Sequence, residues 1–473
     1  MISFILNNKK HTTGLPPGAV ALDLLREEAG LTGTREGCRE GDCGACTVLL
    51  GTLLLQGIEY RAVNSCILPV GELHGRHLVT IEGINPEEGL SPLQKVFVEE
   101  GASQCGFCTP GIIMSLTGYL LGTVDPDDTE AADSLAGNIC RCTGYVSISK
   151  SARTVSGITG RSPAECCTSR EHLEWLVEKE ILPPNFLGIE EMLTALNADG
   201  SEADVSGETV TVAGGTDLFA VEAENLRNTD LKFLSRETGM NGITVLENRI
   251  LIGAGATVRD IIDSGVFRNA GNLEQSLQLV ASPGVRNRAT VGGNIVNASP
   301  VGDLTIIFLA LDAKLRISSG SDYREVQLKD FFRGYKLFDL SPGELLESLV
   351  YKKPDSTTFI NFEKIAMRQH LDIASVNTAA AFRVCGGRIE KADISAGGVA
   401  PVPLYLERTS AALRGMKIST DTAQLAVRTA RSEVSPIDDV RGSAEYKELL
   451  LGKLVAAHFA ELFPGQINAG ELL

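Results

Sequence analysis

Short stretches of alternating apolar and polar residues open the chain. ISFILNN followed by KKHTT predicts a hairpin that turns at Asn7 and Asn8, and ALDLLREE at 21–28 predicts a short helix that ends before Gly30. Two more apolar runs, TVLLGTLLLQ at 47–56 and HLVTIEG at 77–83, predict strands. We therefore expect a small α+β domain over residues 1–84.

The pattern then becomes helical. Ser91-Pro92-Leu93-Gln94 combines a capping box with proline at the first helical position, and it predicts a helix over 92–100. Further helices are predicted at 109–121, 127–135 and 145–155. Four short helices indicate a bundle, so we expect a second domain over residues 85–155.

The remaining chain divides into three parts. Residues 156–184 have a mixed pattern with one short helix around Trp175, which predicts an interdomain linker. From residue 185 strands and helices alternate over glycine-rich turns, which predicts a larger α/β domain over 185–355. Three strand-like runs and helices at 421–432 and 443–463 predict an α+β subdomain over 356–473.

Composition and charge exclude several classes of function. The 473 residues are 43% hydrophobic and 22% charged, which is ordinary globular composition. The formal net charge of −17 disfavours nucleic acid and anionic membrane surfaces as partners. No apolar run approaches the length of a spanning helix, and the first ten residues lack the order of a signal peptide. We expect a soluble, cytoplasmic protein.

The cysteines give the first chemical signal, because eight of the eleven lie between residues 38 and 142. Cys38, Cys43 and Cys46 have the C-x4-C-x2-C spacing of a plant-type [2Fe–2S] ferredoxin loop, and Cys66 supplies a fourth thiol. Glycines between them allow the loop to curl and its N–H groups to point at the sulfurs. A zinc site is the alternative, although the loop contains no histidine.

A second cysteine set follows in QCGFCTPG and NICRCTG. Cys105 and Cys108 are expected at one helix terminus and Cys140 and Cys142 at another, where the helix dipole stabilises thiolates. Either a second [2Fe–2S] cluster or zinc fits this set taken alone. The remaining cysteines lack spaced partners and are assigned no chemistry: Cys166, Cys167 and Cys385.

Three glycine-rich segments are candidates for phosphate binding. VAGGTDL at 212–218 and ATVGGNIVNASPVGD at 289–303 each contain adjacent glycines, whose N–H groups can form a nest for a diphosphate. Two tight β-turns are an equally good interpretation. IGAGAT at 252–257 is an incomplete dinucleotide fingerprint, because Val258 stands in place of the third glycine, and we expect a structural turn there.

Two other residue types complete the survey. Lys364 lies among apolar strand residues, where a lysine usually guards a solvated edge, so its role does not follow from spacing. The six histidines form no H-E-x-x-H motif and have no partner serine or cysteine elbow. Hydrolytic chemistry therefore has no support.

In this order, the motifs CREGDCGAC, QCGFCTPG, NICRCTGY, AGGTDL, TVGGNI and SPVGD resemble the molybdenum hydroxylase (xanthine oxidase) family. Within it, the chain is most similar to the iron-sulfur and FAD small subunit of bacterial xanthine dehydrogenases. The resemblance implies a β-grasp ferredoxin-like domain, a four-helix [2Fe–2S] domain, a two-part α/β FAD-binding domain of the vanillyl-alcohol oxidase type and an α+β C-terminal subdomain.

The resemblance also implies roles for individual residues. It makes Cys38, Cys43, Cys46 and Cys66 ligands of one [2Fe–2S] cluster, and Cys105, Cys108, Cys140 and Cys142 ligands of the other. It makes Gln104 a contact of the molybdenum cofactor's pterin. The implied FAD contacts are Val212, Ala213, Gly214, Gly215, Thr216, Asp217, Leu218, Thr290, Gly292, Gly293, Asn294, Asp303, Leu346 and Lys364. Val280 and Ala281 replace an aromatic residue of some relatives, so adenine stacking is expected to differ.

The implied function is electron transfer for a molybdenum enzyme. A separate large subunit would hold the molybdenum cofactor and hydroxylate the substrate, so no catalytic residue is expected on this chain. Two [2Fe–2S] clusters would carry electrons to FAD and on to NAD+, in a dimer of heterodimers that acts in purine metabolism. The alternatives are the corresponding subunit of an aldehyde, nicotinate or other N-heterocycle dehydrogenase, a stand-alone NAD(P)H-dependent reductase, and a non-enzymatic metal-binding scaffold.

Overall fold

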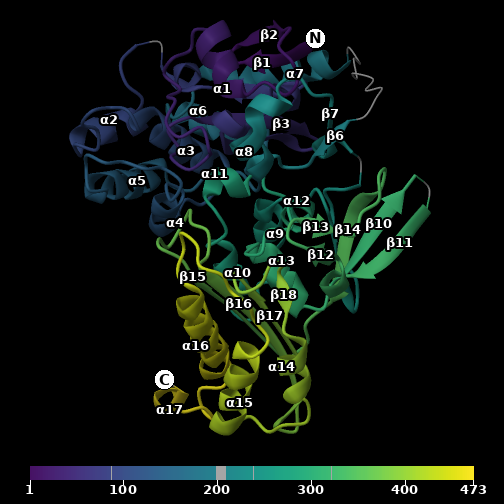
Figure 1. The fold of residues 1–473 in the computed structure, drawn as a ribbon. Helices are drawn as coiled ribbons and strands as arrows, with labels where there is room; N and C mark the ends of the chain where they lie inside the picture. The colour runs from purple at the N-terminus through teal and green to yellow at the C-terminus, as the bar shows by residue number, and fades with distance from the viewer. Residues whose placement is uncertain (87, 199–208, 238, 321, 473) are drawn as a thin grey trace. The chain divides into compact units, whose positions relative to one another are not determined.

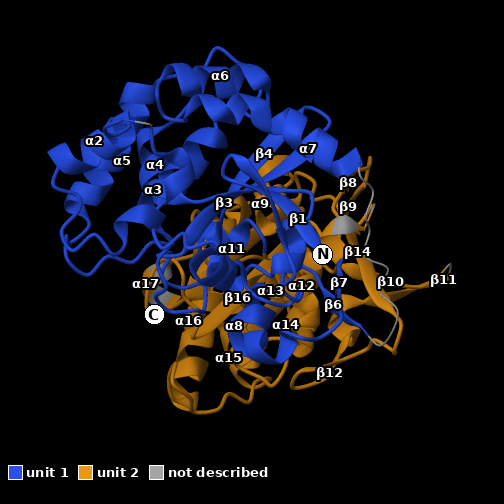
Figure 2. Ribbon diagram, turned by 90° about the horizontal axis from the view of Figure 1, so that it is seen from above, with its two compact units in different colours: residues 1–233, 282–288 blue, residues 234–281, 289–473 orange. Residues whose placement is uncertain are grey.

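The computed structural model describes residues 1–86, 88–198, 209–237, 239–320 and 322–472 (Figure 1). The chain forms two compact units, coloured separately in Figure 2. Unit 1 comprises residues 1–233 and 282–288, and unit 2 comprises residues 234–281 and 289–473. The mixed α and β class that the sequence predicts is confirmed.

Unit 1 begins with a five-stranded sheet in the order β2-β1-β5-β3-β4. The predicted hairpin is present and turns at Asn7, whose φ is 56°. The predicted helix at 21–28 forms a short α-helix, Ala21–Asp23, that continues as a π-helical turn, Leu24–Glu28. The strands are β1 (Ile2–Leu6), β2 (Lys9–Thr13), β3 (Thr47–Leu54), β4 (Gly57–Asn64) and β5 (His77–Val79).

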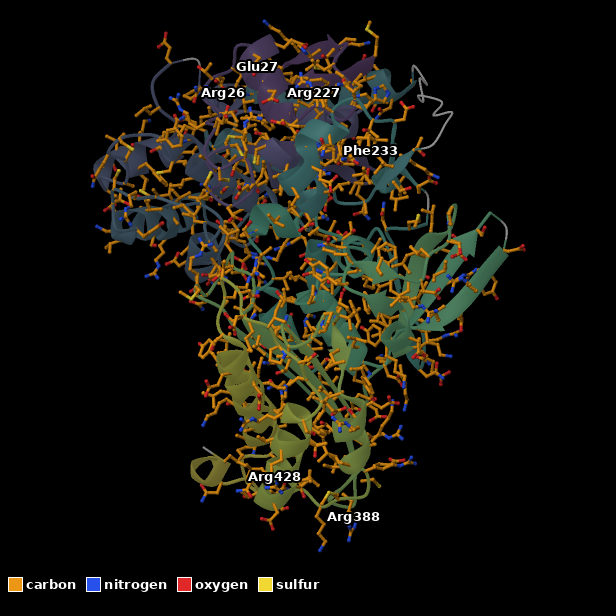
Figure 3. All side chains as sticks on the ribbon, viewed as in Figure 1. Arg26, Glu27, Arg227, Phe233, Arg388 and Arg428 are labelled. Atoms are coloured by element: carbon orange, nitrogen blue, oxygen red, sulfur yellow. The ribbon has the colours of Figure 1, made fainter. Side chains whose placement is uncertain are left out.

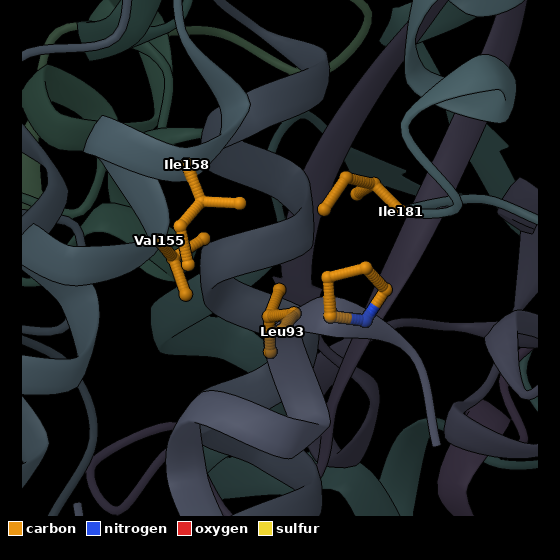
Figure 4. Close-up of a pocket in the computed structure, with 5 residues that line it drawn as sticks. Leu93, Val155, Ile158 and Ile181 are labelled. Carbon is orange, nitrogen blue, oxygen red and sulfur yellow. The ribbon is translucent and has the colours of Figure 1, made fainter. Parts of the chain in front are cut away.

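Helices follow where the periodicity predicts them. They are α2 (Pro92–Glu99), α3 (Thr109–Leu121), α4 (Asp128–Asp133) and α5 (Val146–Thr159). The capping box at Ser91 and Gln94 is formed. The stretch predicted as a linker contains α6 (Arg170–Glu178). Ile181, which follows this helix, packs with Leu93, Val155 and Ile158 around a small apolar gap (Figure 4). Helix α7 (Ile189–Ala198) continues the same apolar core.

A buried histidine in this core makes stability depend on pH. His77 Nε2 donates to the carbonyl of Asn7 (2.6 Å) and Nδ1 accepts from the hydroxyl of Tyr60 (2.8 Å). Burial lowers the pKa of His77 to about 4, from 6.5. The folded state keeps this ring neutral, whereas the unfolded chain protonates it. The contribution of His77 to stability is therefore fully present above pH 6.5 and is lost as the pH falls towards 4.

We expect this group to contribute about 3 kcal/mol to that loss, at 1.36 kcal/mol per pKa unit. Thermal unfolding at pH 7 and pH 5 should therefore show a smaller difference in His77→Gln, which keeps a polar side chain but cannot titrate. Asn85→Ala, which alters an exposed side chain that does not titrate, is the control and should retain the wild-type pH dependence. Equal pH dependence in wild type and His77→Gln would contradict the assignment.

Unit 1 ends in a small β-α-β element. Strands β6 (Val210–Val212) and β7 (Leu231–Phe233) pair in parallel, and α8 (Thr216–Leu226) connects them. A short helix from later in the chain, α11 (Pro283–Arg286), also packs in this unit, where the amide of Asn287 donates to the carbonyl of Ala62 (2.8 Å).

Unit 2 opens with a five-stranded sheet in the order β11-β10-β14-β9-β8. Its strands are β8 (Ile243–Val245), β9 (Arg249–Gly253), β10 (Lys314–Ser319), β11 (Asp322–Gln327) and β14 (Leu345–Lys352). The connecting helices are α9 (Val258–Ser264), α10 (Leu273–Leu277), α12 (Val291–Val296) and α13 (Asp303–Ala310), and β12 (Phe332–Gly334) and β13 (Leu337–Phe338) form a hairpin. The alternative interpretation of ATVGGNIV as a tight β-turn is wrong, because Thr290 caps helix α12.

The last part of unit 2 is a four-stranded sheet with helices against it (Figure 1). Helix α13 contacts β16 and β17, and α16 contacts β15 and β16. Arg428 of α15 is exposed (Figure 3), whereas Ala423, Ala426 and Ala430 of the same helix are buried. The elements are β15 (Thr358–Ile365), β16 (Val376–Cys385), β17 (Arg388–Gly397), β18 (Leu404–Tyr405), α14 (Glu407–Ala412), α15 (Thr420–Arg431), α16 (Ala444–Leu462) and α17 (Ala469–Leu472).

Candidate iron-sulfur and flavin sites

The β3–β4 hairpin brings the first cysteine set together. Cys38, Cys43 and Cys46 lie in the loop before β3, and Cys66 lies in the turn after β4. Thr47 and Asn64 are register partners, so the residues just outside them are neighbours. The hydroxyl of Ser65 closes this end by donating to the carbonyl of Cys46 (2.8 Å).

Backbone N–H groups surround these sulfurs. Glu40 and Asp42 each donate an N–H to Cys38 Sγ at 3.3 Å, and Cys38 N–H donates to Cys43 Sγ at 3.4 Å. The Cys43 and Cys66 thiols, with these N–H groups, hold the pKa of Cys38 well below its usual range. A Cβ at Gly37 would lie 2.6 Å from Cys43 Sγ, so the loop needs glycine there. These contacts stabilise a thiolate at Cys38.

The second cysteine set lies before two helices, as expected. Cys108 is the N-cap of α3, and Cys140 and Cys142 precede α5. Cys105 and Cys142 are exposed with their sulfurs 3.6 Å apart, while Cys108 and Cys140 are buried. Burial and a hydrogen bond with Cys140 raise the pKa of the Cys108 thiol to about 12. The four thiols therefore form one exposed pair and one buried pair.

A left-handed turn shapes the loop around Cys140. Tyr145 has φ 68°, and its hydroxyl accepts the N–H of Cys140 (3.0 Å). Thr143 Oγ1 accepts the N–H of Tyr145 (3.2 Å) and lies 3.3 Å from Cys140 Sγ. These contacts fix the loop that presents Cys140.

The donor set fits a [2Fe–2S] cluster at both places. Such a cluster takes two cysteines on each iron, and the thiols of both sets lie close together in pairs. Within the described ranges, no three His, Cys, Asp or Glu side chains group as they would around a single metal ion. The residues that would hold the clusters are the eight cysteines that the sequence predicts.

The two cysteine loops are bonded to each other. The N–H of Ile139 donates to the carbonyl of Cys43 (2.9 Å), and the amide of Asn138 donates to the carbonyl of Gly44 (3.1 Å). A Cβ at Gly111 would lie 2.1 Å from the oxygen of Gly44, so α3 approaches this loop closely. Because Ile139 precedes Cys140, one hydrogen bond links the two cysteine sets.

The first glycine-rich motif forms a turn at the carboxyl end of β6. Val212 is buried, and Gly215 caps α8 with φ 70°. A Cβ at Gly215 would lie 3.1 Å from both Val212 Cγ1 and Phe219 Cδ2, so the left-handed turn and the close packing both favour glycine. The predicted residues 212–218 thus lie together in unit 1, in the strand-turn-helix arrangement that suits a phosphate.

The second glycine-rich motif differs from an open nest. Gly292 donates its N–H to the carbonyl of Ala254 (2.7 Å), and Gly293 donates to Thr290 Oγ1 (3.0 Å). The N–H of Asn294 is bonded to the carbonyl of Thr290, and its Oδ1 accepts from Thr305. A Cβ at Gly292 would lie 2.7 Å from Ala254 Cβ. These glycines serve close packing of α12 in unit 2.

A buried polar group joins three elements of unit 2. Lys364 Nζ donates to Asp303 Oδ2 (2.7 Å) and to the carbonyl of Leu279 (2.9 Å), with side-chain exposures of 4% for Lys364 and 10% for Asp303. The amide of Asn377 donates to Asp303 Oδ1 (2.6 Å). Lys364 is therefore an internal ion-pair partner rather than an edge guard. Leu346, also predicted near FAD, is buried in β14.

The other predicted positions are placed as follows. Gln104 is exposed beside Cys105. Cys166 and Cys167 lie before α6, and Cys385 is the exposed last residue of β16. The IGAGAT segment is a structural turn, as expected, because Gly253 and Gly255 donate to the carbonyls of Gly242 and Met240.

Sequence reasoning missed three side chains that build these sites: Asn138, Arg288 and Asn377. Each bonds to a residue 74 to 94 positions away. Only Asn138 gave a usable signal, because it stands two residues before Cys140 in the cysteine motif. Arg288 lies directly before the second glycine-rich motif and Asn377 lies outside every motif, and neither position signals a contact with Gly214 or Asp303.

Family comparisons agree with this arrangement. Residues 4–70 match the 2Fe-2S iron-sulfur cluster binding domain, and residues 80–153 match the [2Fe-2S] binding domain. Residues 188–350 match the FAD binding domain in molybdopterin dehydrogenase, and residues 362–462 match the CO dehydrogenase flavoprotein C-terminal domain. The chain belongs to the molybdenum hydroxylase family. It carries two [2Fe–2S] domains and one FAD-binding domain of that family.

Individual relatives come from several branches of the family. Xanthine dehydrogenase/oxidase of Mus musculus is 31% identical over 87% of this chain, and xanthine dehydrogenase 1 of Arabidopsis thaliana is 29% identical over 92%. The chain spans only 34% and 38% of the length of these relatives. A solved carbon monoxide dehydrogenase from Hydrogenophaga pseudoflava is 26% identical with a TM-score of 0.52, covering 55% of this chain and 91% of that one.

Proposed function

We propose that the chain is the electron-transfer subunit of a xanthine dehydrogenase, passing electrons from a partner's molybdenum centre to NAD+. It would act in the cytoplasm, in a dimer of heterodimers with a large molybdenum-binding subunit. The iron-sulfur clusters, when bound, carry single electrons, and FAD accepts two and releases them as a hydride. Its domains would be 1–84, 85–155, 185–355 and 356–473, with 156–184 between the second and third.

The hydrogen bond from Ile139 to Cys43 is the observation that carries this proposal. It connects a ligand of the first cysteine set to the residue beside Cys140 of the second, at 2.9 Å. Such a link has a purpose if electrons pass between the two sites. A stand-alone reductase needs one cluster, and a scaffold needs no contact between two.

This chain's own residues would also hold the flavin. In unit 1 the turn at 212–218 offers N–H groups to a diphosphate. In unit 2 the buried Lys364 and Asp303 offer a fixed cation and carboxylate. Thr290 caps α12, Asn294 lies within α12, and Leu346 lies in β14. We propose as FAD contacts all the residues that the family resemblance implies. The N–H groups of Gly292 and Gly293 are already bonded within the protein, to the Ala254 carbonyl and to Thr290 Oγ1.

An apolar surface around the second cysteine set supports a docked partner. Phe107 (46% exposed), Ile139 (41%) and Tyr145 (43%) lie on the loops that carry the cysteines, and Val146 (78%) begins α5. Exposed apolar side chains gathered in this way mark interaction sites. The large subunit would cover them, with Gln104 beside the pterin.

The test is anaerobic reduction of the complex purified with its partner. Xanthine should reduce both the iron-sulfur and flavin absorbance, and NAD+ should reoxidise them faster than air-equilibrated buffer does. Reduction by an aldehyde, nicotinate or carbon monoxide but not by xanthine would keep the electron-transfer role and overturn the substrate. Faster reoxidation by dioxygen would overturn the acceptor. The match to carbon monoxide dehydrogenase makes carbon monoxide an essential arm.

A second experiment separates the proposal from a self-contained reductase. NADH added to the isolated chain with ferricyanide would support turnover in either case, because the flavin reaction is reversible. Only the proposed subunit should gain substrate-dependent NAD+ reduction when the partner is added. A purified chain that contained zinc and no flavin would contradict both.

The link between the cysteine loops gives a further prediction. Asn138→Ala removes the hydrogen bond to the Gly44 carbonyl, which is worth about 1 kcal/mol. We expect a small loss of thermal stability and slower electron transfer between the two clusters in rapid-freeze EPR. Asn85→Ala, which removes an exposed hydrogen bond with Gln94, is the matched control and should change neither. Unchanged transfer rates in Asn138→Ala would show that this contact is not used.

A further inference from the structure

Arg288 is a buried cation behind the first glycine-rich turn. Its side chain is 7% exposed, and Nη2 donates to the carbonyl of Gly214 at 3.0 Å. It lies in the segment 282–288, which belongs to unit 1 although its neighbours in sequence belong to unit 2. The contact therefore lies entirely within unit 1.

This bond sets the direction of one peptide N–H group. The carbonyl of Gly214 and the N–H of Gly215 belong to the same planar peptide and point in opposite directions. Because the Gly214 oxygen is held towards Arg288, the Gly215 N–H points away from Arg288. Without the bond, two adjacent glycines would leave this peptide free to rotate, because neither has a Cβ to restrict it.

The charge of Arg288 is only partly balanced. The carboxylate of Glu72 is fully buried and lies 3.8 Å from Arg288 Nη1, but only 2.8 Å from Arg76 Nη1. Arg288 Nε is buried and has no hydrogen-bond partner among the described residues. A guanidinium in such a place raises the positive potential at the turn in front of it, since buried charges are weakly screened.

We propose that Arg288 is a positioning residue for the FAD diphosphate, holding the Gly214–Gly215 peptide with its N–H towards the phosphates and adding positive charge behind them. The inference rests on the proposed function, because it takes FAD as the ligand of the 212–218 turn. It assigns a role to a residue outside every motif recognised in the sequence. Both functions, orientation and charge, are lost in Arg288→Met and kept in Arg288→Lys.

The experiment measures FAD affinity directly. The complex is stripped of flavin and titrated with FAD, following the quenching of flavin fluorescence. Arg288→Met removes both functions, and the loss of a charge-assisted hydrogen bond should raise the Kd about tenfold to a hundredfold. Arg288→Lys keeps the charge and one donor, so it should recover most of the affinity. Arg227→Met, which removes a half-exposed arginine at the far end of α8 and leaves the Gly214 bond intact, is the control and should stay within about threefold of wild type.

A second readout distinguishes positioning from general damage to the fold. The flavin-free Arg288→Met complex should keep both reduced-cluster EPR signals and a cooperative thermal transition, at a lower temperature than the wild-type apoprotein. If Arg288→Met does not fold, Glu72→Gln with Arg288→Met removes both members of the buried pair and should show the same loss of FAD affinity. A Kd within twofold of wild type in either variant would overturn the proposal. So would equal losses in Arg288→Lys and Arg288→Met.

The outcomes for the two proposals differ. Failure of the wild-type complex to bind FAD would reject the proposed function itself. Normal FAD binding by wild type together with normal binding by Arg288→Met would leave the function standing and reject only the role of Arg288.

Discussion

Replacing Cys43 with serine should abolish one of the two reduced-cluster EPR signals and reduce substrate-dependent NAD+ reduction below detection. Cys43 accepts the N–H of Cys38 at its sulfur and the N–H of Ile139 at its carbonyl, so it belongs both to the first cysteine set and to the link with the second. Serine is a poor ligand for iron in place of a thiolate. The other signal should persist, because Cys105, Cys108, Cys140 and Cys142 are unchanged.

Cys385→Ser provides the matched control. Cys385 is exposed at the end of β16 and lies in unit 2, whereas both cysteine sets lie in unit 1. Iron content, both EPR signals and turnover should equal those of wild type. If Cys43→Ser kept two unchanged signals, the ligand assignment would be wrong. Loss of both signals would show that the two loops fold only together.

Lys364→Met should cause the second large effect, loss of flavin together with loss of stability. The lysine and Asp303 are almost completely buried, and breaking such a pair costs about 3–5 kcal/mol because it leaves an unpaired carboxylate inside the protein. We expect the variant without flavin to unfold at a lower temperature than the wild-type apoprotein. As purified, the variant should retain less than about a tenth of the wild-type FAD, because a loss of about 1.4 kcal/mol in binding free energy lowers the affinity about tenfold.

A double variant separates these two effects. Asp303→Asn combined with Lys364→Met removes both charges, so most of the stability should return, and Asn377 can still donate to the oxygen at position 303. FAD should remain weakly bound, because the groups proposed to contact it are still missing. Recovery of both stability and flavin would show that the ion pair is structural only. Lys352→Met, which removes an exposed lysine from Asp355, is the control for surface charge.

The sequence predicted the elements whose ends carry strong local signals. The hairpin at Asn7, the capping box at Ser91 and the helices predicted at 421–432 and 443–463 all formed as expected, whereas α14 was not predicted. Strand β4 was missed, although Glu59 and Arg61 alternate with apolar residues there as in a half-buried strand. These two charged side chains pair with each other at 2.8 Å. ATVGGNIV was misread because adjacent glycines usually mark a turn. Here Gly292 lies in a helix, where its missing Cβ allows contact with Ala254.

The candidate sites divide in the same way. Cysteine spacing predicted both sets of thiols, because most of their members are close together in sequence. Cys38, Cys43 and Cys46 share one loop, and the second set consists of two closely spaced pairs. Asn377 and Arg288 act on Asp303 and Gly214 from 74 residues away, and nothing near them in sequence signals that contact. Neighbouring side chains on β16 show how such contacts arise: Asn377 bonds to Asp303 of α13, while Thr378 bonds to His458 of α16.

The origin of segment 282–288 has a consequence for synthesis. Unit 1 takes its last piece from beyond residue 281, and the bond between Asn287 and the Ala62 carbonyl spans 225 positions. A growing chain that ends at residue 233 would contain all eight cysteines but neither this bond nor the one from Arg288 to Gly214. The ribosome must add about fifty more residues before the N-terminal unit can close, at about 5–20 residues per second. Partial chains should therefore be sensitive to protease until that segment emerges.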